Sequence, residues 1–156
     1  DINGPECTCG SFGCFEALAS GRVISKMASQ AIEEIEEDES SAILRLADEK
    51  IENIRGETVA RAAQEGDLLA KEIFGNIGRV IGIGLVNVVN IFNPELVVLA
   101  GGIAQAGELI LSPAREVVLK QALIPNSQVV EIVLTELKDK ASVIGAAALA
   151  FHEINL

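Results

Sequence analysis

The C-terminal third of the chain alternates short apolar runs with helical stretches. Residues 95–100 (Glu-Leu-Val-Val-Leu-Ala) and residues 129–134 predict two strands, of which the first has the continuous apolar content of a buried strand. Helical patterns over 108–121 and 141–151 follow the two strands. The order strand, helix, strand, helix is typical of an α/β layer with parallel strands and packed helices.

The N-terminal two thirds predict helices only. They are expected over 17–38, 41–54 and 57–64, and a longer one from 66–67 to about Phe92, where Asn93-Pro94 ends it. Within the long helix, Gly78 and Gly82 predict close packing against another helix. Gly82-x-Gly84 imitates the start of a dinucleotide-binding fingerprint, but it lies inside a helix rather than at a strand-to-helix turn, so that interpretation fails.

Composition limits what such a chain can do. With 156 residues, 49% of them hydrophobic, the chain suits one packed domain or one piece of a larger protein. Asp and Glu number 23 against 12 Lys and Arg, a formal net charge of -11, which disfavours nucleic-acid or membrane-surface binding through this segment. Aromatic residues make up only 3%, too few for base-stacking platforms.

Neither a signal peptide nor a membrane span is expected. The longest apolar run, 80–92, contains glycines and asparagines and is too short to cross a bilayer. The composition is typical of a cytoplasmic protein, the location we expect, and in that setting an odd number of cysteines argues against a disulfide framework. Asn87 and Asn90 lie three residues apart in this run, and we expect them to bond neighbouring backbone.

The three cysteines of the chain all lie within eight residues. Cys7, Cys9 and Cys14 are interspersed with glycines that permit a tight loop, a pattern typical of a metal-binding knuckle. Structural zinc prefers four Cys or His ligands, so one ligand is missing. The only histidine, His152, could fold back to supply it, although its position at a helix end disfavours this. A loop of three reduced thiols without metal is the other interpretation.

Two segments resemble one family. The first segment, residues 7–16, has the pattern Cys7-x-Cys9-Gly10-x-x-Gly13-Cys14-x-Glu16 and is similar to the zinc motif of the ROK family. This family groups bacterial sugar kinases, including glucokinase-like enzymes, with sugar-responsive repressors. Residues 90–102 resemble a second ROK block, with Ala100 at a position where the family often has glycine. The resemblance implies the C-terminal half of an actin-like ATPase (ribonuclease H-like) fold over residues 1–156. It places the zinc knuckle at 7–16 and a nucleotide-side strand-turn-helix at 95–121.

The resemblance also implies roles for individual residues. Cys7, Cys9 and Cys14 would hold structural zinc, with a fourth ligand, a histidine, expected before Asp1. Glu16 would bind sugar hydroxyls, although by position alone it is an acidic residue in the first turn of a helix. Gly101 and Gly102 would lie against the adenosine of ATP, whereas the pattern alone fits a ligand cradle or a plain tight turn equally.

The function expected is therefore ATP-dependent phosphorylation of a glucose-like hexose with Mg²⁺. The phosphate-binding loop and the catalytic base are expected upstream of residue 1, so this stretch alone should be inactive. A homodimer or homotetramer is expected from the family. The alternative is a ROK-type sugar-responsive transcriptional repressor, and a third possibility is a free-standing zinc-binding scaffold.

Overall fold

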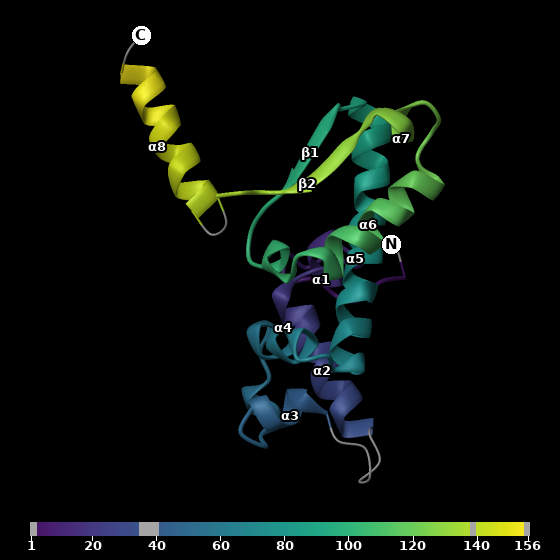
Figure 1. Cartoon of the computed structure of the whole chain (residues 1–156), viewed down its shortest axis with the longest axis vertical. Helices are drawn as coiled ribbons and strands as arrows, with labels where there is room; N and C mark the ends of the chain where they lie inside the picture. The colour runs from purple at the N-terminus through teal and green to yellow at the C-terminus, as the bar shows by residue number, and fades with distance from the viewer. Residues whose placement is uncertain (1–2, 35–40, 138–139, 155–156) are drawn as a thin grey trace.

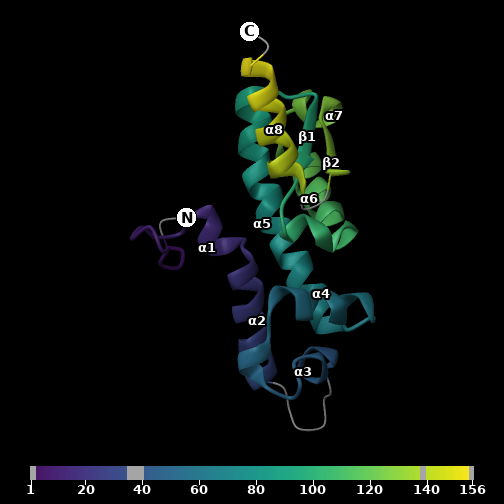
Figure 2. The same cartoon turned by 90° about the vertical axis from the view of Figure 1, so that its left-hand side faces the viewer.

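The computed structural model describes residues 3–34, 41–137 and 140–154. In chain order its elements are α1 (Phe15–Leu18), α2 (Gly21–Glu34), α3 (Ala42–Leu46), the 3-10 turn η1 (Ile51–Asn53), α4 (Gly56–Gln64), α5 (Leu68–Phe92), β1 (Leu96–Leu99), η2 (Ile103–Ala106), α6 (Glu108–Gln121), α7 (Asn126–Val129), β2 (Glu131–Leu134) and α8 (Ala141–Ile154). The long α5 runs through the molecule, with α2 to α4 around one end and the sheet with α6 and α7 at the other (Figures 1 and 2).

The two strands confirm the expected parallel layer. They pair in register from Leu96 opposite Glu131 to Leu99 opposite Leu134. Helix α6 connects them, and the Arg115 Nε–H donates to the carbonyl of Ile132 at 2.8 Å, which ties this helix to β2. The prediction that the first strand is buried was wrong, because alternate residues of β1 are exposed and only the other face packs on the core.

Helices α5 and α6 pack closely at two glycines, as the sequence predicts. A Cβ atom at Gly78 would lie 2.5 Å from Pro113 Cγ, and one at Gly82 would lie 2.6 Å from Val117 Cβ. Pro113 lies inside α6, where its ring packs on Gly78. Only glycine allows the two backbones to approach this closely.

Helix α5 bears on the expectation that the chain has no membrane span. The apolar run 80–92 is only part of this helix. Among the described residues, the whole 25-residue helix is the one that is long and apolar enough to cross a bilayer. Its buried residues, including Ile73, Phe74 and Val89, lie in the protein core. Because α2, α4 and α6 all pack on it, α5 is the central core helix of this fold.

The predicted N-terminal helix over 17–38 is interrupted. Ala19 leaves the helical conformation with φ -143° and ψ 69°, so that α1 ends at Leu18 and α2 starts at Gly21. The residues predicted to end this helix, from position 35 onward, lie outside the described residues. The break matters because it separates the short helix carrying Glu16 from the amphipathic α2.

Two other predicted boundaries also differ. The helix expected over 41–54 is divided into α3 and η1, because Asp48 and Glu49 both adopt a left-handed φ of 57°. Val129, predicted to start the second strand, ends α7 instead. The predicted helices over 57–64, 108–121 and 141–151 and the long α5 are confirmed within three residues.

The buried side chains form two clusters joined by α5. One lies among α2, α3, α4 and the first half of α5, with Phe74 and Ile77 near its centre. The other joins the second half of α5 to α6 and β2 through Leu85, Val89 and Ile132. Helix α8 stands away from both clusters in Figure 1, and its apolar side chains are exposed.

Candidate metal and ligand sites

The cysteine loop is shaped by backbone hydrogen bonds. The Cys7 N–H donates to the Ser11 carbonyl at 2.8 Å, and the Gly10 N–H donates to the Cys7 carbonyl at 2.9 Å. Gly10 and Gly13 both have positive φ values, 83° and 61°, which side-chain-bearing residues rarely adopt. The two glycines noted in the sequence therefore turn the chain so that the three cysteines face one another.

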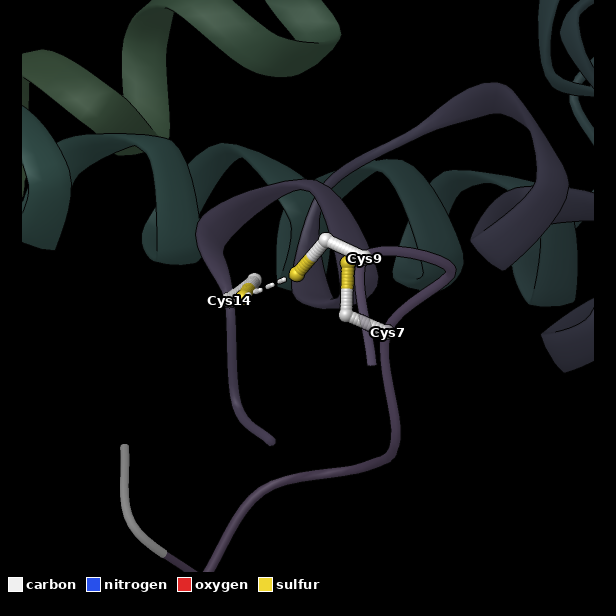
Figure 3. Close-up of side chains that lie close together, drawn as sticks. All are labelled: Cys7, Cys9 and Cys14. Atoms are coloured by element: carbon white, nitrogen blue, oxygen red, sulfur yellow. Dashed lines mark hydrogen bonds between the residues drawn. The ribbon is translucent and has the colours of Figure 1, made fainter. Parts of the chain in front are cut away.

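The three sulfur atoms converge on one point. Those of Cys7, Cys9 and Cys14 all lie within 4.8 Å of one another, and the Cys9 and Cys14 sulfurs are 3.5 Å apart (Figure 3). Tetrahedral zinc with Zn–S bonds of about 2.3 Å separates its sulfur ligands by about 3.8 Å. The spacing and the soft thiolate donors fit three corners of a zinc site.

The electrostatics of the cluster also favour a cation. The Ser11 backbone N–H, followed by the neighbouring thiols, lowers the pKa of Cys9 below its usual 9.0. Hydrogen bonding to Cys9, and then to Cys7, raises the pKa of Cys14 to about 11. Without a cation the cluster thus stabilises one thiolate and opposes the next, whereas a bound divalent ion stabilises all of them.

His152 does not join the cluster. It lies in α8, and the group of potential metal ligands within the described residues contains the three cysteines alone. Figures 1 and 2 both show α8 well separated from the N-terminal loop. The described residues therefore supply three ligands, and the fourth remains a prediction.

Glu16 lies directly beside this loop, at the start of α1. Its Oε1 accepts a hydrogen bond from Arg22 at 3.0 Å, and its Oε2 accepts from the Cys7 thiol and the Thr8 hydroxyl, each at 3.5 Å. The side chain is 57% exposed. Both carboxylate oxygens thus have protein donors, and because the side chain is largely exposed they can accept further hydrogen bonds from vicinal hydroxyls.

Arg22 is a site residue that the sequence reasoning missed. It lies six residues after Glu16, across the break between α1 and α2, so no helical periodicity links the two. Together with Cys7, Thr8, Lys26 and Arg55 it lines a groove of about 680 Å³. Glu16 does not line this groove itself, but its hydrogen-bond partners Arg22, Cys7 and Thr8 do.

The predicted nucleotide residues lie at the carboxyl end of β1. Gly101 has a φ of 94°, and an added Cβ at Gly101 or Gly102 would meet no atom within 4 Å. Gly102 lines a cavity of about 310 Å³, together with Gly21 and Gly56 at the starts of α2 and α4. A volume near 300 Å³ lies at the small end of the range for ligand sites.

The asparagines of α5 have structural roles, as expected. Asn87 Nδ2 donates to the Ile83 carbonyl at 3.2 Å, and Asn90 Oδ1 accepts from the Leu123 backbone N–H at 2.9 Å. Neither residue lines the cavity beside Gly102.

Comparison with known proteins places these features in one family, because the ROK family model matches residues 1–153. The chain belongs to the ROK family. It is 32% identical to a glucokinase of Thermotoga maritima, over 97% of this chain and 47% of that protein. It is also 32% identical to a xylose repressor of Caldicellulosiruptor bescii, over 95% of this chain and 36% of that protein.

The expected actin-like ATPase fold of ROK sugar kinases is likewise confirmed. The crystal structure of a ROK glucokinase from Streptomyces griseus, solved in complex with glucose and AMPPNP, superimposes with a TM-score of 0.83 at 32% identity. The match covers 94% of this chain and 47% of that one. The ROK chain described here thus spans about half the length of these glucokinases, and it is similar to both the kinases and the repressors of the family.

Proposed function

We propose that residues 1–156 are the C-terminal portion of an ATP-dependent hexose kinase of the ROK type, acting on glucose or a glucose-like sugar. The observation that carries this proposal is the cavity beside Gly102, because a kinase must hold a nucleotide where a sugar-sensing repressor need not. Its position off the carboxyl end of β1 suits ligand binding in an α/β fold. The similar glucokinase of Streptomyces griseus was solved with AMPPNP.

On the nucleotide side, the strand-turn-helix of residues 95–121 holds the adenosine of ATP. Gly101 and Gly102 present backbone without side chains to open space, which lets a planar base approach closely. Gly21 and Gly56 also line this cavity. The role of these residues is to bind and orient the nucleotide.

On the sugar side, Glu16 accepts hydrogen bonds from two hydroxyls of the hexose. Arg22 and Thr8 hold its carboxylate. Cys7, Cys9 and Cys14 hold zinc within the knuckle of residues 7–16, and this ion supplies a structural cross-link when bound. The knuckle fixes the backbone that leads into Glu16, since Cys14 directly precedes α1.

We assign no catalytic residue to this chain. The general base that takes the proton from the sugar hydroxyl, and the loop that binds the phosphates with Mg²⁺, are proposed for the preceding portion of the whole protein. Residues 1–156 alone are accordingly inactive in this proposal. The whole protein is proposed to work in the cytoplasm as a homodimer or homotetramer.

The direct test is a coupled assay of ATP-dependent hexose phosphorylation with the full-length protein. Turnover of glucose or another hexose is expected, and its absence with every hexose would contradict the proposal.

A Gly102→Leu variant tests the nucleotide site within the same assay. The position has an ordinary φ of -59° and open space around its Cβ, so the variant should fold. It should raise KM for ATP roughly tenfold or more, equivalent to about 1.4 kcal/mol, and leave KM for the sugar unchanged. Equal KM values for ATP in variant and wild type would remove Gly102 from the nucleotide site.

The alternative function is a sugar-responsive transcriptional repressor. It is supported by the similarity to the xylose repressor of Caldicellulosiruptor bescii, which equals the similarity to the glucokinase. Sugar-dependent DNA binding by the full-length protein, together with no turnover of any hexose, would favour this alternative.

A further inference from the structure

The three cysteines of the knuckle differ in their surroundings. Cys9 is exposed and Cys14 is half-buried, whereas Cys7 is only 6% exposed. The sulfurs of Cys9 and Cys14 contact each other at 3.5 Å, the pair joined by the dashed line in Figure 3. The Cys7 thiol instead donates to Glu16 Oε2. Two of the three sulfurs therefore form an accessible pair.

We propose that Cys9 and Cys14 are a reversible disulfide site that opens the knuckle under oxidation and leaves Cys7 reduced. A disulfide requires an S–S distance of about 2.05 Å, so the two sulfurs would have to approach by about 1.5 Å. Gly10 and Gly13, which lie between the two cysteines, give the short loop the freedom to make this change.

The chemistry needs a two-electron oxidant, and hydrogen peroxide is the class that fits an exposed thiol. The Cys9 sulfur attacks the O–O bond, which breaks to give a Cys9 sulfenic acid and one water. The Cys14 sulfur then displaces the hydroxyl group from Cys9, which forms the S–S bond and releases a second water. The two sulfurs lose two electrons and the peroxide gains them. In the metal-free cluster the two thiol protons leave in the waters, whereas from zinc-bound thiolates the solvent supplies these two protons.

Oxidation removes two of the three sulfur donors from the metal site. Cys7 alone cannot hold zinc in a closed structural site, so the ion leaves when the disulfide forms. Cys14 directly precedes α1, and Glu16 lies two residues further along. Loss of the zinc cross-link therefore loosens the backbone that leads into Glu16 and weakens sugar binding there. This effect on sugar binding rests on the proposed function, whereas the disulfide itself does not.

The test treats the full-length protein with hydrogen peroxide, alkylates the remaining thiols, and maps the peptide containing residues 7–22 by mass spectrometry. A Cys9–Cys14 link, seen as the loss of two hydrogens, is expected together with an alkylated Cys7 and reversal by dithiothreitol. Zinc release, followed with a chromogenic chelator, should rise in parallel with the link. A link involving Cys7, or three alkylated cysteines after treatment, would overturn the proposal.

Two variants serve as controls. Cys7→Ser should still form the link, because Cys7 takes no part in it, whereas Cys14→Ser should not form it. Should Cys7→Ser fail to fold, wild-type peptide mapping alone still decides which cysteines pair. A mapped link in a protein that phosphorylates no hexose would contradict the proposed function alone. An active kinase without the link would contradict the disulfide site alone.

Discussion

At the scale of single residues, the proposed binding of the sugar depends on the contacts of Glu16. The Arg22–Glu16 ion pair is exposed on both sides, with side chains 64% and 57% accessible. Exposed pairs of this kind contribute little to stability, at most about 1 kcal/mol. The pair therefore matters for the direction of the carboxylate rather than for holding the fold together.

We expect Glu16→Gln in the full-length protein to weaken sugar use selectively. Charge-assisted hydrogen bonds are worth about 1.5–3 kcal/mol, so KM for the hexose should rise roughly 10- to 100-fold while KM for ATP stays constant. Steady-state kinetics with each substrate varied in turn measure both values. Glu65→Gln is a matched control, because Glu65 forms its ion pair with Arg45 away from the site. Equal changes for ATP and sugar would remove the role of Glu16.

At the scale of elements, regular helices were predictable and their interruptions were not. Gly78 and Gly82 carry a local signal of close packing, and the structure uses it as expected. Asp67 was predicted only to start the long helix, and in the structure its side chain caps α5. The break between α1 and α2 falls at Ser20-Gly21, a turn signal that the prediction of one helix over 17–38 overlooked. The left-handed pair Asp48–Glu49 has no such signal, since it contains neither proline nor glycine. Tertiary packing there outweighs local propensity.

The helix contact of α5 with α6 gives a stability prediction. Gly82→Ala places a Cβ 2.6 Å from Val117 Cβ and 2.8 Å from the Ala114 carbonyl oxygen, so one backbone must move. We expect a loss of about 1–3 kcal/mol, measured by urea unfolding. In the same helix, the nearest atom to an added Cβ at Gly75 is Arg79 Nη1, at 3.7 Å. Gly75→Ala should therefore be neutral or stabilising by about 0.5–1 kcal/mol. Equal losses in both variants would contradict the close contact.

The cap of α5 gives a pH dependence. Burial opposes ionisation of Asp67, but hydrogen bonds from the Ala70 N–H, the Ser41 hydroxyl and the Ala42 N–H outweigh it and lower its pKa below 3.8. A lowered folded-state pKa means that the ionised cap stabilises the protein above about pH 4, and this contribution is lost as pH falls through the lowered value.

We expect Asp67→Ala to cost about 1–2 kcal/mol at pH 7, and less as the solution is acidified. Chemical unfolding of both proteins between pH 7 and pH 3 measures the difference. A difference that does not change with pH would show that the charge of Asp67 has no part in the cap.

At the scale of the whole molecule, the chain has two cores on one central helix and a sheet with an uncovered face. Leu96 and Val98 of β1 are 52% and 51% exposed, and α8 exposes Val143, Leu149 and Phe151. The apolar residues of β1 predict a buried strand, but their pattern does not show whether the residues that would bury them lie within the same 156 residues. This chain spans about half of the length of the glucokinases it resembles.

The cysteine knuckle is one of the two segments that carry the family resemblance, and the structure agrees with its pattern. The spacing of Cys7, Cys9 and Cys14 predicted that the sulfurs converge, which the structure bears out. The contact between Cys7 and Glu16 was not predictable, because it depends on how the loop folds onto α1.

Metal analysis of the purified full-length protein tests the knuckle most directly. Elemental mass spectrometry should find about one zinc per chain bound at this site, and replacement of Cys9 by Ser should lower that value sharply. Protein without zinc, in which Cys7, Cys9 and Cys14 all react freely with an alkylating reagent, would contradict the assignment of these three sulfurs to a metal.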